Sequence, residues 1–266
     1  MSSSRARGVP VDDLGHPVVL PDPVRRVVSL VPSLTEAIAH TAPDVLVGAT
    51  VWCTRPAGLE VERLRGTKNP HVRRIADMAP DLVVANREEN REPHVRELRR
   101  AGIPVWVTDI RTVPGAFASL HRLFAACALA SPDWLARAEA AWSAPAPSGP
   151  RVAVPVWRDP WMWVGGDTYA DDVLSRLGAV NVLAGGRYPR LAPEEAAAAG
   201  PDVVVLPDEP YRFTADDGPD AFPGLPVVLI EGRDLTWYGP SMTAARERLA
   251  SVLAPFSPPD GPCGGG

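Results

Sequence analysis

The feature that most constrains this chain is an internal repeat of short motifs. Pro-Asp followed by valines occurs at 80–84 and again at 201–205, with an offset of 121 residues between Asp81 and Asp202. In the same order, and at nearly the same offset, RVVSLV is matched by RVAVPV and AGIPVWV by PGLPVVL. Pro-Asp and valine runs also begin strands in unrelated α/β proteins, but three matched pairs in one order indicate two copies of one design.

An alanine-rich segment, residues 112–142, separates the two copies. Its apolar residues recur at helical spacing until Ser131-Pro132 interrupts the pattern. Serine is a good N-cap and proline a good first helical residue. The pattern therefore predicts two consecutive helices, Pro114–Leu129 and Pro132–Trp142.

Strands alternate with helices on both sides of this segment, which predicts a mostly parallel sheet in each half. The expected fold class is α/β, with two similar Rossmann-like lobes joined by a helical spine. We expect an N-terminal lobe over residues 1–112, a spine and linker over 113–149, and a C-terminal lobe over 150–254. Residues 255–266 are rich in proline and glycine, which predicts a disordered tail.

The composition excludes several classes of function. A net charge of −5 disfavours nucleic acid and anionic membranes as partners. No apolar run approaches the length of a membrane-spanning helix. The N-terminal residues lack the apolar segment of a secretory signal, which predicts a cytoplasmic protein as the sequence is written; a misassigned start site would make the protein extracytoplasmic.

No catalytic motif stands out in the chain. The sequence has no phosphate-binding loop, no G-x-G-x-x-G after a strand and no G-x-S-x-G turn. The histidines do not pair at metal-ligand spacing, and Cys53, Cys127 and Cys263 form no C-x-x-C. Cys127 is expected in a core and Cys263 in the tail, while Cys53 has no activating base nearby in the sequence. We therefore predict no enzyme, no metal site and no intrinsic cofactor.

Most of the eight tryptophans follow strands instead of lying on helix faces. Trp and Tyr offer a large contact area at a small entropic cost, and a site lined by them suits a flat or bulky organic ligand. Others are expected to fill the cores: Trp106, Trp134, Trp142 and also Trp163. The aromatic ligand contacts that we predict are Trp52, Trp157, Trp161, Trp237 and Tyr238.

Three polar residues complete the predicted ligand site: Ser33, Lys68 and Asn86. Lys68 lies in the loop 51–70, which follows a predicted strand, and ligands of parallel α/β sheets collect at such strand ends. Ser33 with Glu36 three residues later also fits a helix-capping box, so a structural role and a ligand role both stay open.

Two glutamates occupy the same step of the repeat. Glu88 lies seven residues after Asp81, and Glu209 lies seven residues after Asp202. A run of charges is usually only a solvated surface. Acids at matched sites of a duplicated fold, however, suit docking onto two matched basic sites of a partner.

Taken in order, these motifs resemble the helical-backbone metal-receptor family. The resemblance rests on RRVVSLVPSLTE, GTKNP, PDLVVANREEN and AGIPVWVTD in the first half and on VPVWRDPWMWVGGDT, PDVVVLPDEPYRF and TWYGPS in the second. It covers about Arg25–Leu253. The family comprises the cobalamin-, haem- and siderophore-binding proteins that serve ABC importers.

The resemblance implies a fold like that of class III periplasmic binding proteins, with two lobes on a rigid helical spine and the ligand in the cleft between them. In the cobalamin receptors of this family an acidic residue on each lobe docks the membrane permease. That role would fall to Glu88 or Glu89 and to Glu209. Asn86 stands where a cobalamin receptor would have an aromatic residue.

We therefore predict non-catalytic binding of a bulky metal chelate, with a cobalamin-like corrinoid favoured over haem or a ferric siderophore. The expected partners are this ligand and an ABC importer permease, with no nucleic acid and with the protein as a monomer. Two alternatives remain: a cytosolic enzyme or chaperone that acts on a corrinoid-like ligand, and a module that binds only a protein partner.

Overall fold

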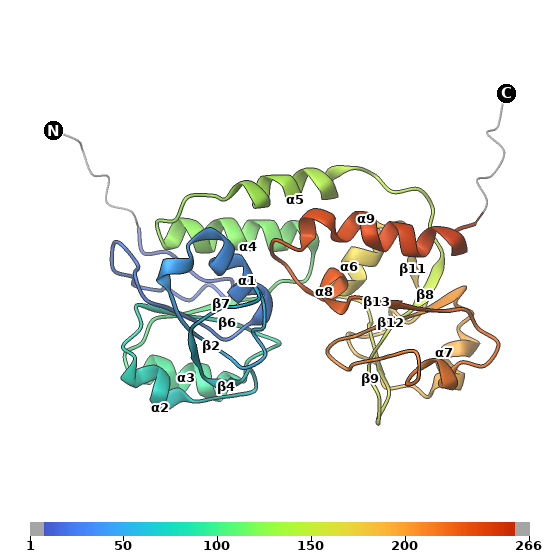
Figure 1. Cartoon of the computed structure of the whole chain (residues 1–266), viewed down its shortest axis with the longest axis horizontal. Helices are drawn as coiled ribbons and strands as arrows, with labels where there is room; N and C mark the ends of the chain where they lie inside the picture. Colours follow the sequence, from blue (N-terminus) through green and yellow to red (C-terminus); the bar gives the residue numbers. More distant parts are fainter. Residues whose placement is uncertain (1–7, 259–266) are drawn as a thin grey trace. The chain divides into compact units, whose positions relative to one another are not determined.

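The computed structural model describes residues 8–258, which form two compact units (Figure 1). Unit 1 consists of the chain up to Ile110 together with residues 114–135 and 238–240. Unit 2 consists of residues 111–113, residues 136–237 and the chain from Ser241 onwards. Most of the predicted tail, including Cys263, lies outside the described residues. The first two residues of the predicted tail instead belong to a short 3-10 helix, Ala254–Phe256.

The two consecutive helices of the predicted spine are confirmed, but they do not form a unit of their own. Helix α4, Val113–Ala126, belongs to unit 1 except for its first residue, whereas α5, Asp133–Ser143, passes from unit 1 into unit 2. Helix α4 ends earlier than predicted because Ala128 adopts a left-handed φ of 56°, a conformation that terminates helices.

Unit 1 is built on a five-stranded parallel sheet with the order β3-β2-β1-β6-β7. Its strands are β1 Val27–Ser29, β2 Leu46–Ala49, β3 Glu62–Arg63, β6 Leu82–Asn86 and β7 Val105–Thr108. The other elements are α1 Pro32–Thr41, a 3-10 helix Pro43–Val45, the antiparallel pair β4 Arg65–Gly66 and β5 Asn69–Pro70, α2 Val72–Asp77 and α3 Glu92–Arg100. In Figure 1, α2 and α3 lie at the opposite end of this unit from α4.

Unit 2 is built on a four-stranded parallel sheet with the order β11-β8-β12-β13. Its strands are β8 Arg151–Ala153, β11 Val180–Asn181, β12 Val203–Pro207 and β13 Val227–Ile230. A separate antiparallel hairpin joins β9 Pro155–Trp157 to β10 Met162–Trp163. The helices are α6 Tyr169–Arg176, α7 Pro193–Ala198, a 3-10 helix Pro219–Ala221, α8 Gly232–Thr236 and α9 Met242–Leu253.

The two sheets repeat one topology, as the duplicated motifs predict. Strands β2-β1-β6-β7 of unit 1 correspond in order and direction to β11-β8-β12-β13 of unit 2. The two Pro-Asp residues also make the same contact. Asp81 Oδ2 accepts from the backbone N–H of Arg26 at 2.9 Å, and Asp202 Oδ2 accepts from that of Arg151 at 2.7 Å. Each aspartate therefore ties its strand to the start of the neighbouring one.

Each unit has its own apolar core. In unit 1, alternate residues of β1, β6 and β7 pack with Ile75, Val95 and Leu98 of α2 and α3. In unit 2, residues of β8 and β12 pack with large aromatic side chains that include Trp163 and Phe213. The tryptophans expected in the cores are all buried there, namely Trp106, Trp134, Trp142 and Trp163. Across the described residues, no helix combines the length and the apolar character needed to cross a membrane.

Cys127 is buried, as the helical pattern predicts, and burial raises the pKa of its thiol to about 12. Cys53 is also fully buried, with its Sγ 3.0 Å from Thr35 Oγ1 and 3.2 Å from Thr50 Oγ1. Burial raises the pKa of the Cys53 thiol, so little of it ionises at neutral pH. Both thiols are structural.

Candidate functional site

Asn86, a predicted ligand contact, ends β6 as a buried structural residue. Its Oδ1 accepts from the backbone N–H of Glu88 at 2.8 Å and of Glu89 at 3.2 Å. Its Nδ2 donates to Thr108 O at 3.2 Å and Thr108 Oγ1 at 3.1 Å, at the end of the adjacent strand β7. The side-chain amide is engaged within unit 1, which gives Asn86 a structural role, and its contact with a ligand stays a prediction. Asn86 holds the loop that presents the two glutamates.

Tyr238 and Ser33 come together in unit 1, although they lie far apart in the sequence. The Tyr238 side chain is 5% exposed, and its hydroxyl hydrogen-bonds with the side chains of Ser33 and Thr108. Burial raises the pKa of Tyr238 well above its ordinary value, and the nearby Glu89 adds to this. The capping role considered for Ser33 is wrong: Val31 is the N-cap of α1 and Ser33 lies within the first turn.

Lys68 and the two glutamates lie beside this hydroxyl cluster. Lys68 Nζ donates a hydrogen bond to the backbone carbonyl of Glu88. The Glu89 side chain is half-buried, and burial raises the pKa of its carboxyl, an effect that the charge of Lys68 partly offsets and that of Glu88 increases. The charges of Glu89 and, to a smaller extent, Glu88 in turn raise the pKa of the Tyr238 hydroxyl.

Trp52 lies against the turn that carries Lys68. A Cβ on Gly66 would lie 2.7 Å from Asn69 Oδ1 and 3.1 Å from Trp52 Nε1, so the indole lies close to the backbone of the β4–β5 pair. The Trp52 side chain is nevertheless 65% exposed. Unit 1 therefore brings one exposed tryptophan close to a lysine whose other neighbours are Glu88 and Glu89.

Replacing Glu89 by glutamine should stabilise the protein at neutral pH and not at low pH. A carboxyl with a raised pKa in the folded state binds its proton more tightly there, so wild-type stability falls as pH rises above about 4.3, the usual value for glutamate, through the raised pKa. Glutamine has no carboxyl to titrate, so the stability of the variant does not fall with pH for this reason. Thermal unfolding of both proteins across this range should show the difference in melting temperature growing with pH, and Glu92→Gln, an exposed acid on α3, serves as the control. A difference that is constant with pH would contradict the raised pKa.

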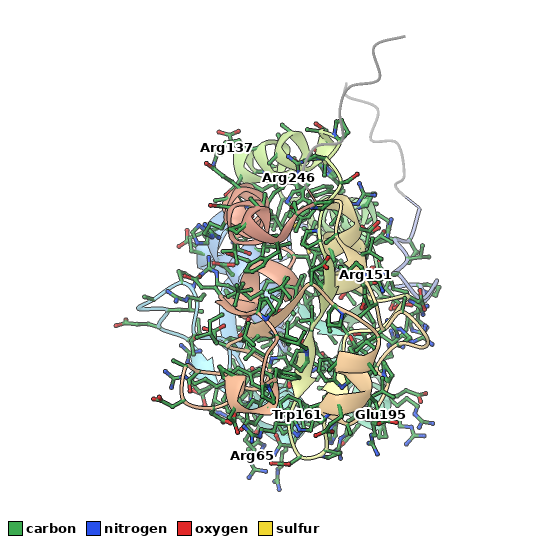
Figure 2. The ribbon with its side chains drawn as sticks, turned by 90° about the vertical axis from the view of Figure 1, so that its right-hand side faces the viewer. Arg65, Arg137, Arg151, Trp161, Glu195 and Arg246 are labelled. Carbon is green, nitrogen blue, oxygen red and sulfur yellow. The ribbon has the colours of Figure 1, made fainter. Side chains whose placement is uncertain are left out.

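Unit 2 presents an aromatic cluster at the β9–β10 hairpin. Trp161 is half-buried and stacked between Trp163 and Phe213, with ring centroids 5.9 and 5.7 Å away. Trp157 is 43% exposed and meets Tyr211 edge to face at 5.7 Å. Figure 2 shows Trp161 at the end of this unit opposite to Arg246 of α9. Trp157 is therefore an exposed ring that contacts this cluster through Tyr211.

Charged side chains contact this aromatic cluster. The guanidinium of Arg158 lies 5.4 Å from the centre of the Trp161 ring and is ion-paired with both Asp217 and Asp220. The Tyr211 hydroxyl donates to Asp217 Oδ2 at 2.7 Å, and this bond raises the pKa of Tyr211. Arg158, Tyr211 and Asp217 were not among the predicted site residues. Their place in loops that follow β9 and β12 is the signal that could have identified them.

Trp237 differs from the other predicted aromatic contacts. Its side chain is only 8% exposed, at the C-terminal end of α8, and its backbone carbonyl accepts from the Tyr169 hydroxyl at 3.2 Å. This burial indicates that Trp237 has a role in packing, and its contact with a ligand stays a prediction. The sequence placed it in a loop, because α8 spans only five residues and begins at a glycine.

Glu209 is also less exposed than a docking residue is expected to be. Its side chain is half-buried, with Oε1 enclosed, and a Cβ on Gly232 would lie 2.5 Å from Glu209 Cγ. Glycine at the start of α8 therefore makes room for this glutamate. Neighbouring Asp208 is exposed and accepts from the Gly232 N–H at 2.6 Å.

The described residues contain no group of three or more His, Cys, Asp or Glu side chains that could hold a metal ion. What they do contain is a polar cluster and an exposed tryptophan on unit 1, and an exposed tryptophan beside an aromatic cluster on unit 2. Each of these surfaces by itself suits contact with an organic ligand, and ligand contact by the eight candidate residues stays a prediction.

Comparisons with known proteins give relatives along nearly the whole chain. The vitamin B12-binding protein of Pectobacterium carotovorum subsp. carotovorum (strain PC1) is 22% identical over 250 residues, which cover 88% of this chain and 90% of that protein. No protein-family model matches the chain.

Solved structures show the same two-lobed α/β fold. The periplasmic vitamin B12-binding protein BtuF of Vibrio cholerae matches with a TM-score of 0.70 and 20% identity over 88% of this chain and 98% of that one. The periplasmic haem-binding protein BhuT, solved in complex with two haems, matches with a TM-score of 0.70 and 26% identity over 87% of this chain and 98% of that one. The predicted fold class is confirmed.

Proposed function

Because this chain belongs to the periplasmic-binding-protein family of ABC importers, we propose that it binds a bulky metal chelate without transforming it. A cobalamin-like corrinoid is the favoured ligand. The observation that carries this proposal is the similarity to a vitamin B12-binding protein over 88% of the chain and 90% of the relative, which spans both units. The exposed Trp52 and Trp157, each held by its own unit, supply the aromatic contact area that such a ligand needs.

Haem is the second candidate ligand. The match to the haem-bound BhuT structure, at 26% identity and nearly full coverage, supports it. A ferric siderophore is the third, and rests on the sequence resemblance alone. An enzymatic role has less support, because the thiol of Cys53 is buried with a raised pKa and the relatives compared are binding proteins.

A titration that follows tryptophan fluorescence tests the proposal. Cyanocobalamin, haemin and a ferric siderophore are added separately to the purified protein, and the corrinoid is expected to quench the fluorescence with one binding site per chain. The visible spectrum of each mixture is recorded before and after incubation. An unchanged chelate recovered after binding supports a binding protein, and a converted product would support the enzyme alternative. Quenching by none of the three would contradict the proposal.

We further propose that Glu88 and Glu209 help to dock the protein on an importer permease. Both follow a strand that begins after Pro-Asp, so they occupy equivalent places in their units. Acids at a docking surface mainly set orientation and association rate, and salt screens their effect. Glu89, which neighbours Glu88 in the same loop, stays the alternative docking residue on unit 1.

Changing Glu88 and Glu209 together to glutamine should abolish capture by the cognate permease and leave ligand affinity unchanged. Capture is measured with the host's corrinoid or siderophore permease at low and high salt. The control carries Glu92→Gln and Glu231→Gln, one exposed acid on each unit. Equal capture of both double variants would contradict the docking role. Fractionation of the same host cells would test the cytoplasmic location that the N-terminal sequence predicts.

A further inference from the structure

We propose that residues 10–18 form a strap that covers the open edge of the sheet in unit 1 and prevents a second copy of this chain from pairing with it. Strand β7 is the last strand in the order of that sheet, so one of its edges has no neighbouring strand among the described residues. An unpaired strand edge is a template for pairing with another chain. The contacts that Asp12 and Asp13 make with β7 and α4 carry the inference, which concerns unit 1 alone and does not depend on the ligand.

The outer edge of β7 can be identified from the bonds on its inner edge. Thr108 O accepts from the backbone N–H of Arg87, which follows β6, at 2.9 Å. The backbone groups of successive strand residues alternate between the two edges, so Val107 and Asp109 present their N–H groups to the outer one. The residues of β7, VWVT, are strong β-formers without charge, and two identical edges can pair about a twofold axis.

The strap occupies this outer edge. Asp12 Oδ2 accepts from the backbone N–H of Val107 at 3.3 Å, and Asp13 Oδ2 accepts from that of Asp109 at 3.1 Å. The backbone N–H of Asp13 donates in turn to Val107 O at 3.2 Å. The N–H and the carbonyl that Val107 presents outwards are therefore both bonded to the strap, and a second chain cannot pair there while the strap is in place.

Two arginines hold the aspartates of the strap. Arg99 of α3 pairs with Asp12 at 2.9 Å, and Arg122 of α4 pairs with Asp13 at 2.7 Å. Ser119 Oγ also donates to Asp13 Oδ2 at 2.6 Å. The two carboxylate side chains are only 0% and 4% exposed, so water screens these contacts weakly. The attachment of the strap therefore depends on both carboxylates.

Asp12 also gives the strap its shape. Its Oδ1 accepts from the backbone N–H groups of Leu14 at 3.0 Å and His16 at 2.8 Å. Gly15, with a φ of 76°, supplies the left-handed residue that this tight turn needs. One carboxylate thus closes the turn with one oxygen and binds β7 with the other.

Unit 2 has no counterpart of the strap. Strand β13 is the equivalent of β7, and Ile230 O accepts from the N–H of Asp208 at 3.2 Å, so Leu229 faces the outer edge. Within residues 8–258, no other segment bonds to the outward N–H of Leu229, and its side chain is 44% exposed. The strap is therefore an addition to unit 1 and not part of the repeated design.

Replacing Asp12 and Asp13 together by asparagine should release the strap with little change in side-chain size. We expect the amides of Val107 and Asp109 to exchange with solvent at least about tenfold faster, by NMR, while the amides of β6 keep their wild-type rates. Sedimentation velocity at increasing protein concentration should show more dimer than in the wild type. The dimer should slow exchange at Val107 again, because β7 is then paired with a second copy.

The control carries Asp22→Asn and Asp44→Asn, two exposed acids of unit 1 whose loss changes the net charge by the same amount. It should keep wild-type exchange at β7 and the wild-type dimer fraction. Wild-type exchange at Val107 in a folded strap variant would overturn the proposal. Faster exchange without more dimer, or a dimer in which Val107 still exchanges fast, would overturn the protective role.

A measurement on the wild type covers the case in which the double variant does not fold. The amides of Leu14, His16 and Val107 all donate to Asp12, so release of the strap exposes them together. We expect the three amides to show similar protection, lower than that of the amides of β6. Clearly different protection among the three would show that the segment does not open as one strap and would overturn the proposal.

Discussion

Replacing Trp237 by alanine should lower the free energy of unfolding by about 3–5 kcal/mol, the usual cost of removing a large buried aromatic side chain. The Trp237 side chain is 8% exposed and lies where α8 ends, directly before the residues that pass into unit 1. Its loss would leave a cavity that the surrounding helices cannot fill. Urea denaturation followed by circular dichroism measures the change. A cost below about 1 kcal/mol, within the range of an ordinary surface substitution, would show that Trp237 is not part of the packed structure.

Replacing Trp157 by alanine should weaken ligand binding without destabilising the fold. We expect corrinoid binding to weaken by about 1–3 kcal/mol, which is typical of a lost aromatic contact, with little change in unfolding free energy. The ring is 43% exposed, and its edge-to-face contact with Tyr211 connects it to a cluster that remains packed without it. The matched change on the other unit, Trp52→Ala, should behave in the same way because that side chain is 65% exposed.

Affinity from calorimetry and stability from urea denaturation are compared for each of these two variants. Tyr188→Ala is the control, since it removes an exposed aromatic residue that is not among the candidate contacts. If Trp157→Ala unfolds the protein, the residue is structural. If it folds and binds as the wild type does, the aromatic surface of unit 2 does not contact the ligand.

The sequence predicts the fold well because its signals are local and repeated. Helices α4 and α5 begin within one residue of the expected positions, and the two Pro-Asp motifs lead into equivalent strands. Local signals fail where a short element lacks periodicity. Helix α8 spans only one turn and starts at a glycine, so its segment reads as a loop.

The candidate site is less predictable because its contacts join residues that are distant in the sequence. A capping box at Ser33 is a reasonable local prediction, but Pro32 begins the helix and the Ser33 side chain bonds with Tyr238 instead. Likewise, the position of Asn86 after a strand suggests a ligand contact, whereas its amide is used by the adjacent strand and the following turn. In both cases the role of the side chain depends on a hydrogen bond to a residue that is distant in the sequence, so a local sequence pattern does not reveal it.

The exposure of aromatic residues is also a tertiary property. Trp52 and Trp237 both follow strands in the sequence, yet one is 65% exposed and the other 8%. The difference arises because Trp52 rests on a single glycine of a short hairpin, whereas Trp237 ends a helix that packs against α6 and α9.

The most direct test of ligand binding is the absorption spectrum of the protein isolated from its own host under native conditions. The account predicts a visible band from a bound chelate, corrinoid in the favoured case, at close to one ligand per chain, and the same ligand should be released unchanged on unfolding. A protein that carries no chelate, and that takes up neither cyanocobalamin nor haemin when each is supplied in excess, would contradict the account.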